Sequence, residues 1–303
     1  MVKKTVSVCL GCLLLFLAAC LLRFPYQAFY YSAGALNLWF EKMIPALLPF
    51  MMLSGLLIRM HLTGIVTACI SPFLGPLFRV RSDCLYVIIT GFLCGFPMGA
   101  RTCRECLEQK KITKKEAQFL LAFCNNIGPI YLTGYVFLLF PEAKRATTVL
   151  LFYGVPLIYG LLLRYIGYRD LEQDAISTVS EKQVLFGEAL HQTILSSLEG
   201  ITILGGYMIF WNLLNLPLHL IPIPQKWKEI FGCLLEITSG LSGMDGAPVG
   251  MSMGLLTFGG FSCMAQTYVC IKGTGLSLTS YLIHKIIQTV CVILLFGIMV
   301  SVS

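Results

Sequence analysis

Long, uninterrupted apolar runs constrain the fold of this chain more than any other feature of its sequence. Residues 6–22 and 290–300, for example, carry no charged side chain. Runs of about 18 to 25 apolar residues cross the ~30 Å hydrocarbon core of a bilayer as α-helices. A transmembrane barrel is excluded, because its strands alternate apolar and polar residues. The sequence therefore predicts an all-α, polytopic membrane protein.

Composition and charge agree with a chain that lies in lipid. Only 12% of the residues are charged and 57% are hydrophobic, whereas soluble domains carry about 25% charge. The formal net charge is +7, and the basic residues lie at the ends of apolar runs instead of along one face. This distribution excludes a nucleic-acid-binding protein as the function class.

Seven segments are predicted to be full spans, and two more apolar stretches are broken. The seven are residues 5–22, 43–60, 119–140, 146–166, 189–213, 254–271 and 279–301. Residues 84–100 and 230–250 contain several Gly and Pro residues, which leave backbone amides unpaired in lipid. We therefore predict two re-entrant or broken hairpin segments that pack inside protein. Residues 62–78 hold two prolines, and whether they span or lie at the interface is open.

The distribution of Lys and Arg predicts the topology. Six basic residues fall between positions 101 and 115, and short loops rich in Lys and Arg face the cytoplasm. Lys3 and Lys4 place the N-terminus there too. Residues 1–42 are then a signal-anchor-like first span with an external segment, and residues 169–188 are a cytoplasmic linker.

The linker separates two halves, residues 43–168 and 189–303, with the same order of elements. In each half an apolar span precedes a Gly/Pro-broken segment, residues 95–100 in one and 243–248 in the other. A polar-punctuated helix and an unbroken span follow. An odd number of crossings separates the halves, so we predict an inverted-topology repeat with a binding site near the bilayer midplane.

The first half offers a hairpin motif and two asparagines for this site. Gly95, Pro97 and Gly99 form the hairpin motif. Asn125 and Asn126 precede Pro129, whose ring displaces the carbonyl four residues earlier and opens the helix. We therefore predict that the two carboxamides bind a polar solute or an ion. The alternative is a kinked helix whose asparagines only bond to neighbouring helices.

The second half offers acidic and amide side chains. Glu199 lies on a polar stripe of its span that is predicted to face inward. Its carboxyl group either binds a proton or a cation, or makes a structural hydrogen bond. Glu236 and Asp245 lie on the broken segment, where freed carbonyls would help to bind a cation. Ser262 and Gln266 share one helix face.

Other charged and reactive residues have simpler readings. Arg59, Arg164 and Lys285 are expected to extend from span ends towards the interface. Cys103 and Cys106 lack the second ligand pair of a zinc site. No phosphate-binding loop, nucleophile elbow or metalloprotease motif is present. We expect no enzyme activity, no metal and no cofactor.

Four blocks in this order resemble the sporulation integral membrane proteins of the YlbJ type. They read GFPMGA at 95–100, FCNNIGP at 123–129, EITSG at 236–240 and FGGFS at 258–262. The resemblance implies a nucleoside recognition or Gate domain, with a core distantly similar to concentrative nucleoside transporters. It also implies a multi-pass protein of the bacterial cytoplasmic (inner) membrane that is linked to endospore formation.

Together these observations predict a transporter or permease for a small polar solute, which could be nucleoside-like. The solute would be transported together with a proton or a sodium ion. The alternative is a non-transporting membrane scaffold for assembly of the spore cortex or coat, which docks sporulation proteins through the basic loop 101–118. The lipid bilayer is a partner in both cases, nucleic acid is a partner in neither, and homo-oligomerisation stays open.

Overall fold

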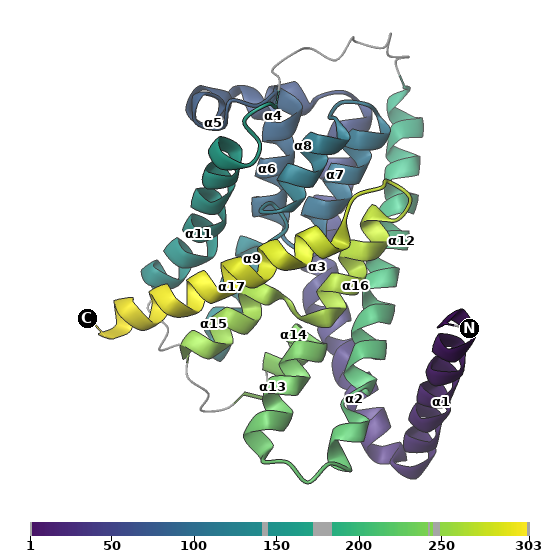
Figure 1. Ribbon diagram of the computed structural model, residues 1–303. Helices are drawn as coiled ribbons and strands as arrows, with labels where there is room; N and C mark the ends of the chain where they lie inside the picture. The colour runs from purple at the N-terminus through teal and green to yellow at the C-terminus, as the bar shows by residue number, and fades with distance from the viewer. Residues whose placement is uncertain (1, 141–144, 172–183, 242, 245–248, 302–303) are drawn as a thin grey trace.

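A computed structural model describes residues 2–140, 145–171, 184–241, 243–244 and 249–301 (Figure 1). Over these residues every regular element is a helix, which confirms the predicted fold class. Before the first half lie α1 Val2–Arg23 and α2 Pro25–Leu38. The first half then contains η1 Trp39–Met43, α3 Ile44–Arg59, α4 Thr63–Ala68, α5 Ser71–Phe78, α6 Ser82–Cys94, α7 Met98–Glu108, α8 Lys114–Leu121, α9 Pro129–Tyr131, η2 Leu132–Val136, α10 Phe137–Leu139 and α11 Arg145–Ile166. The second half contains α12 Phe186–Leu213, η3 Leu216–His219, α13 Gln225–Leu235, α14 Ile237–Leu241, α15 Val249–Phe258, α16 Gly260–Ile271 and α17 Leu278–Ser301.

Five helical segments of the described chain are long and apolar enough to cross a bilayer. They are Pro25–Arg59, Arg145–Ile166, Phe186–Leu218, Val249–Ile271 and Leu278–Met299. A polytopic membrane protein is thus confirmed, with five such helices where the sequence predicted about seven spans. Residues 119–140 form no single span, because the chain leaves the helix after α8 and resumes it at α9.

The remaining differences lie at the edges of the bundle. The apolar part of α1, Ser7–Arg23, is shorter than a full span. Residues 25–42, predicted as part of an external segment, continue into α3 as one helical segment of 35 residues. Residues 62–78 form α4 and α5, which have 6 and 8 residues and are too short to cross a bilayer.

The segment Pro25–Arg59 packs antiparallel against α12. Asn212 Nδ2 donates to the carbonyl of Tyr31 at 2.7 Å, and Trp39 Nε1 donates to the carbonyl of Ile201 at 2.8 Å. A Cβ at Gly205 would lie 2.6 Å from the Trp39 ring, so glycine is needed for this close approach. The first span of each predicted repeat therefore lies beside the other with opposite direction, as an inverted repeat requires.

Each half then contains a helical hairpin and an interrupted helix. In the first half α6 and α7 pack together around a connection at Gly95, and the chain is non-helical between α8 and α9. In the second half α13 and α14 pack together around Glu236, and Gly259 separates α15 from α16. Figure 1 shows the α6/α7 hairpin at one end of the bundle and the α13/α14 hairpin at the other. The two broken segments that we predicted are these hairpins.

The predicted broken segment 230–250 contains the turn of the second hairpin, which lies at Glu236 between α13 and α14. Of the block 243–248, residues 245–248 lie outside the described residues. The carboxylate of Glu236 accepts the backbone N–H groups of Thr238 and Ser239, so it caps the first turn of α14. This local cap sets the start of α14 directly after α13.

Arg164, near the end of α11, joins the short helices to the bundle. Its guanidinium is buried and donates to five backbone carbonyls, those of Phe78, Arg79, Tyr168, Arg169 and Leu171. The prediction that Arg164 extends to the interface is therefore wrong. The carbonyls left free at the ends of α5 and α11 provide these acceptors.

Candidate functional site

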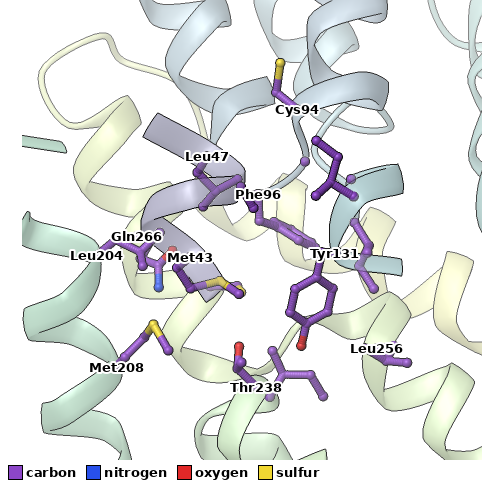
Figure 2. A pocket seen from close by; sticks show the side chains of 18 of the residues that line it. Met43, Leu47, Cys94, Phe96, Tyr131, Leu204, Met208, Thr238, Leu256 and Gln266 are labelled. Carbon is purple, nitrogen blue, oxygen red and sulfur yellow. The ribbon is translucent and has the colours of Figure 1, made fainter. Parts of the chain in front are cut away.

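A cavity lies where the two hairpin turns meet the two helix interruptions (Figure 2). Its volume is about 70 Å³, enough for a few water molecules. The first hairpin contributes Gly95 and Phe96, and the first interruption contributes Ile127 and Gly128. The second half contributes Glu236, Thr238, Gly259 and Gln266, and the walls come from η1, α3 and α12 through Met43, Leu47, Leu204 and Met208. The hairpin turns and helix interruptions of both halves therefore reach this cavity.

Glycine allows the first hairpin turn to approach the first interruption. Gly95 has φ of +83°, and a Cβ there would lie 2.4 Å from the backbone nitrogen of Gly128. A Cβ at Gly99 would lie 2.2 Å from the carbonyl oxygen of Cys124. Two of the three hairpin-motif residues are thus required for direct backbone contact, while Pro97 precedes the first residue of α7.

The polar groups of the cavity are few. Gln266 Nε2 donates to Ser262 Oγ at 3.1 Å, as their shared helix face predicted, and Gln266 lines the cavity. The hydroxyl of Tyr131 is buried and points towards the side chain of Thr238 (Figure 2). A tyrosine hydroxyl has one donor and two acceptor lone pairs, so beside a cavity it can also bond to water or to a ligand.

Glu236 places a carboxylate at the cavity wall. Its side chain is 2% exposed. Thr238 N–H donates to Oε1 at 3.2 Å, and Ser239 N–H donates to Oε2 at 2.7 Å. Ser239 Oγ lies 2.7 Å from Oε2 and 3.0 Å from Asn212 Oδ1. The carboxylate is therefore held by the start of α14 and connected through Ser239 to α12.

Asn125 and Asn126 support the first interruption and do not line the cavity. Asn125 Nδ2 donates to Thr267 Oγ1 at 2.9 Å and to the Tyr281 hydroxyl at 3.1 Å, and Asn125 Oδ1 accepts the backbone N–H of Ala100 at 3.3 Å. Asn126 Nδ2 donates to the carbonyl of Phe123 at 2.6 Å. This geometry is that of the alternative reading, in which the asparagines bond within the protein.

Pro129 begins α9, where its missing N–H removes no helical hydrogen bond. The predicted opening of the chain before it is observed, since residues 125–128 are not helical. Ile127 and Gly128, and not the two asparagines, line the cavity from this opened segment.

Of the other predicted acidic residues, Glu199 does not line the cavity. Glu199 is exposed on α12, and the buried face of this helix carries Thr193, Ser197 and Ile201 instead. Glu199 is two residues from Ser197 and from Ile201, which places it about 200° round the helix from each. The predicted inward stripe through Glu199 is therefore wrong. Asp245 lies outside the described residues.

Sequence reasoning missed three polar residues of α17 that bind the opened segment. Tyr281, Lys285 and Gln288 are fully buried on one face. Lys285 Nζ donates to Asn126 Oδ1 at 2.7 Å, and Gln288 Nε2 donates to the carbonyl of Ala122 at 2.7 Å. The prediction that Lys285 extends to the interface is wrong. Their spacing of i, i+4 and i+7 within an apolar helix was the available signal.

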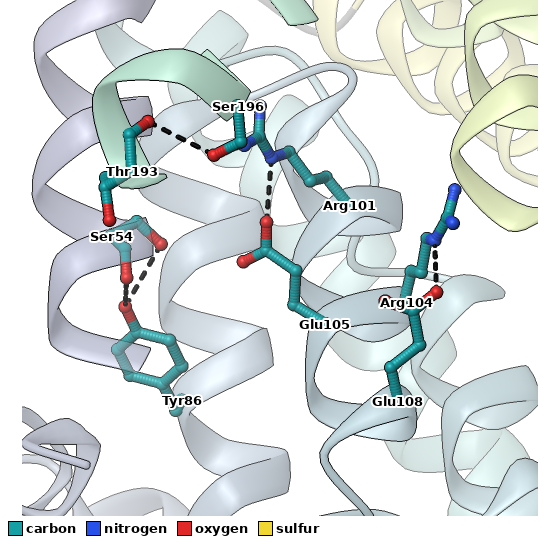
Figure 3. A network of polar contacts seen from close by, with 8 residues as sticks. All are labelled: Ser54, Tyr86, Arg101, Arg104, Glu105, Glu108, Thr193 and Ser196. Atoms are coloured by element: carbon teal, nitrogen blue, oxygen red, sulfur yellow. Dashed lines mark hydrogen bonds and ion pairs between the residues drawn. The ribbon is translucent and has the colours of Figure 1, made fainter. Parts of the chain in front are cut away.

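A polar network binds the first hairpin to α12 at the end of the bundle away from the second hairpin (Figure 3). Arg101, on α7, donates from Nη2 to Ser196 Oγ at 3.1 Å and from Nε to Glu105 Oε1 at 2.9 Å. Residues 101–108 are thus helical, so the predicted basic loop 101–118 shortens to residues 109–113 between α7 and α8. Thr113 and Glu116 form a capping box at the start of α8.

Comparison with known proteins gives one informative relative. No protein-family model matches the chain, and no solved structure matches it. The sequence is 25% identical to the sporulation integral membrane protein YlbJ of Bacillus subtilis strain 168 over an alignment of 320 residues. The alignment covers 91% of this chain and 78% of that protein. An integral membrane relative agrees with the five spanning helices, and the chain is a multi-pass membrane protein. The similarity to sporulation integral membrane proteins of the YlbJ type, expected from four short blocks, is confirmed over most of the chain.

Proposed function

We propose that this protein is a transporter or permease for a small polar solute in the bacterial cytoplasmic membrane, where it serves endospore formation. The observation that carries the proposal is the cavity bounded by two hairpin turns and two helix interruptions. Interrupted helices at the interface of two inverted halves build the midplane sites of many secondary transporters. The similarity to a sporulation membrane protein supports the biological context.

The cavity lining indicates what the solute would present. Met43, Leu47 and Met208 offer an apolar wall, while the Tyr131 hydroxyl offers a hydrogen-bonding group. Gln266 offers a carboxamide. A solute with one apolar face and a few hydrogen-bonding groups fits this lining, and a nucleoside is one member of that class. Glu236 is the group on which a co-transported proton or sodium ion would bind.

To carry the solute from one membrane face to the other, one hairpin would have to separate from α12, the helix against which it packs. The α6/α7 hairpin is bound to α12 through Arg101 and Ser196, and the α13/α14 hairpin through Ser239 and Asn212. These contacts lie at opposite ends of α12. Breaking one set while keeping the other would open the cavity to one side of the membrane at a time.

Uptake into liposomes tests this proposal. Purified protein is reconstituted, and uptake of labelled nucleosides and other small polar metabolites is measured with and without proton or sodium gradients. The variants are Tyr131→Phe and Glu236→Gln, with Glu199→Gln as the matched control, because Glu199 is a carboxylate in the bundle that lies away from the cavity. One lost hydrogen bond to the solute predicts uptake lowered about 3- to 10-fold for Tyr131→Phe.

Outcomes separate the transporter from the scaffold. Uptake that is lost in Glu236→Gln and kept in Glu199→Gln supports the transporter. Equal loss in both variants contradicts the site. If no tested solute enters while charge reversal at Lys110 and Lys111 blocks spore formation in cells, the non-transporting scaffold that docks sporulation proteins is the better account.

A further inference from the structure

Lys285 is a fully buried amine in the middle of an apolar span. The segment Leu278–Met299 has a mean hydropathy of 2.1, and Lys285 is 0% exposed within it. An ammonium in such a place is costly unless protein groups replace its hydration, so an intramembrane lysine is a functional candidate by default. No ion pair among the described residues includes Lys285. Its partners must therefore be neutral.

Two neutral groups from two different elements face the amine. Nζ lies 2.7 Å from Asn126 Oδ1, on the opened segment, and 4.9 Å from the centroid of the Phe96 ring, on the first hairpin turn. The carboxamide of Asn126 is fixed in this orientation because its Nδ2 donates to the carbonyl of Phe123. The amine thus lies where the hairpin, the opened segment and α17 meet.

These partners have the chemistry of a site for a monovalent cation. A carboxamide oxygen is a ligand for hard cations, and an aromatic face attracts a desolvated cation through the charge distribution of its ring. Opened helices in transporters commonly bind such an ion. We propose that the ammonium of Lys285 is a tethered cation, which fills a monovalent-cation site formed by Asn126 and Phe96 and holds this junction together without a metal ion.

The tethered cation would have two consequences for the protein. Phe96 also lines the cavity, so the ammonium fixes one wall of the proposed solute site. A dissociable ion would be needed only in the other half, where Glu236 lies. The inference does not depend on transport, because it concerns how the first hairpin is held.

Thermal unfolding of the full-length protein in detergent tests the proposal directly. The midpoint is measured in chloride salts of sodium, potassium, ethylammonium and choline at equal ionic strength. The wild type is expected to unfold at the same midpoint in ethylammonium and in choline, because Lys285 already fills the site, while any effect of sodium through Glu236 would be common to the wild type and the variants. Lys285→Ala leaves a vacant site, so its midpoint should fall and then rise by several degrees in ethylammonium relative to choline.

Two control variants separate a vacant cation site from general destabilisation. Lys285→Met fills the volume without a charge and should show a lowered midpoint in every salt. Gln288→Met removes another buried donor from the same helix face and should be equally insensitive to the salt. A wild type that ethylammonium stabilises over choline as much as it stabilises Lys285→Ala, or a Lys285→Ala protein that unfolds at the same midpoint in both salts, overturns the proposal.

A second pair of variants keeps the proposal testable if Lys285→Ala does not fold. Asn126→Asp places a carboxylate beside the ammonium, and the two charges should compensate each other. Asn126→Asp with Lys285→Met then leaves that carboxylate unpaired and should unfold at a clearly lower midpoint. Equal midpoints for the single and double variants would mean that Lys285 carries no charge at this site, which contradicts a tethered cation.

Discussion

The contact between the first hairpin and the opened segment gives the sharpest test of the packing described here. The carbonyl oxygen of Cys124 lies between α6 and α7, and a Cβ would be 1.9 Å from it at Gly91 and 2.2 Å from it at Gly99. Ordinary contact begins at 3.4 Å, so the methyl group of Gly99→Ala forces a displacement of about 1.2 Å. The obstacle is backbone on both sides, and no side-chain rotation relieves it.

Gly99→Ala is therefore expected to lower the free energy of unfolding by about 3 kcal/mol or more, which is the upper end of the range for overpacked cores. For a chain of this size each kcal/mol lowers the thermal midpoint by roughly 2–4 °C, so a fall of about 6–12 °C is expected. Thermal unfolding in detergent measures it. Uptake should fall with it, because the displaced hairpin turn lines the cavity.

Gly206→Ala is the matched control for Gly99→Ala. Gly206 lies inside α12, and no atom is within 4 Å of the position of its Cβ. Alanine is favoured over glycine inside a helix by about 1 kcal/mol, so this variant should be as stable as the wild type or more stable. If Gly99→Ala and Gly206→Ala unfold at the same midpoint, the close approach of the hairpin to Cys124 is refuted.

Two further predictions concern groups outside the cavity. Burial would raise the pKa of Glu116, but hydrogen bonds from Arg81 and Thr113 outweigh it and lower the pKa below its usual 4.5. The stability that this carboxylate contributes is present above about pH 4.5 and is lost as the pH falls through the lowered pKa. The thermal midpoint of Glu116→Gln, measured from pH 3 to 7, should therefore lie below that of the wild type at neutral pH and approach it in acid. A difference in midpoint that stays constant with pH contradicts the argument. Arg164→Lys keeps the charge but offers three donors to five carbonyls, so two bonds are lost and the free energy of unfolding should fall by about 3 kcal/mol. Arg59→Lys, where only Gln192 accepts a bond, is the control in the same unfolding assay and should change little.

The sequence by itself determined the class of the protein and the position of its broken helices. Apolar run length depends only on neighbouring residues, so the membrane character and the all-α fold could be predicted from it. Local chemistry likewise predicted the interruption before Pro129. The bilayer enforces these features, because unpaired backbone groups are tolerated only inside protein.

Only the tertiary structure decided which polar side chains meet. Asn126 and Lys285 are 159 residues apart in the sequence, and Ala122 and Gln288 are 166 apart. No local pattern reveals that such residues are partners. For the same reason the sequence placed Asn126 in the binding site and Lys285 at the interface, whereas the fold brings them together behind the cavity wall. Burial of a polar group is acceptable only when a partner completes its hydrogen bonds, and the folded chain alone determines which partner that is.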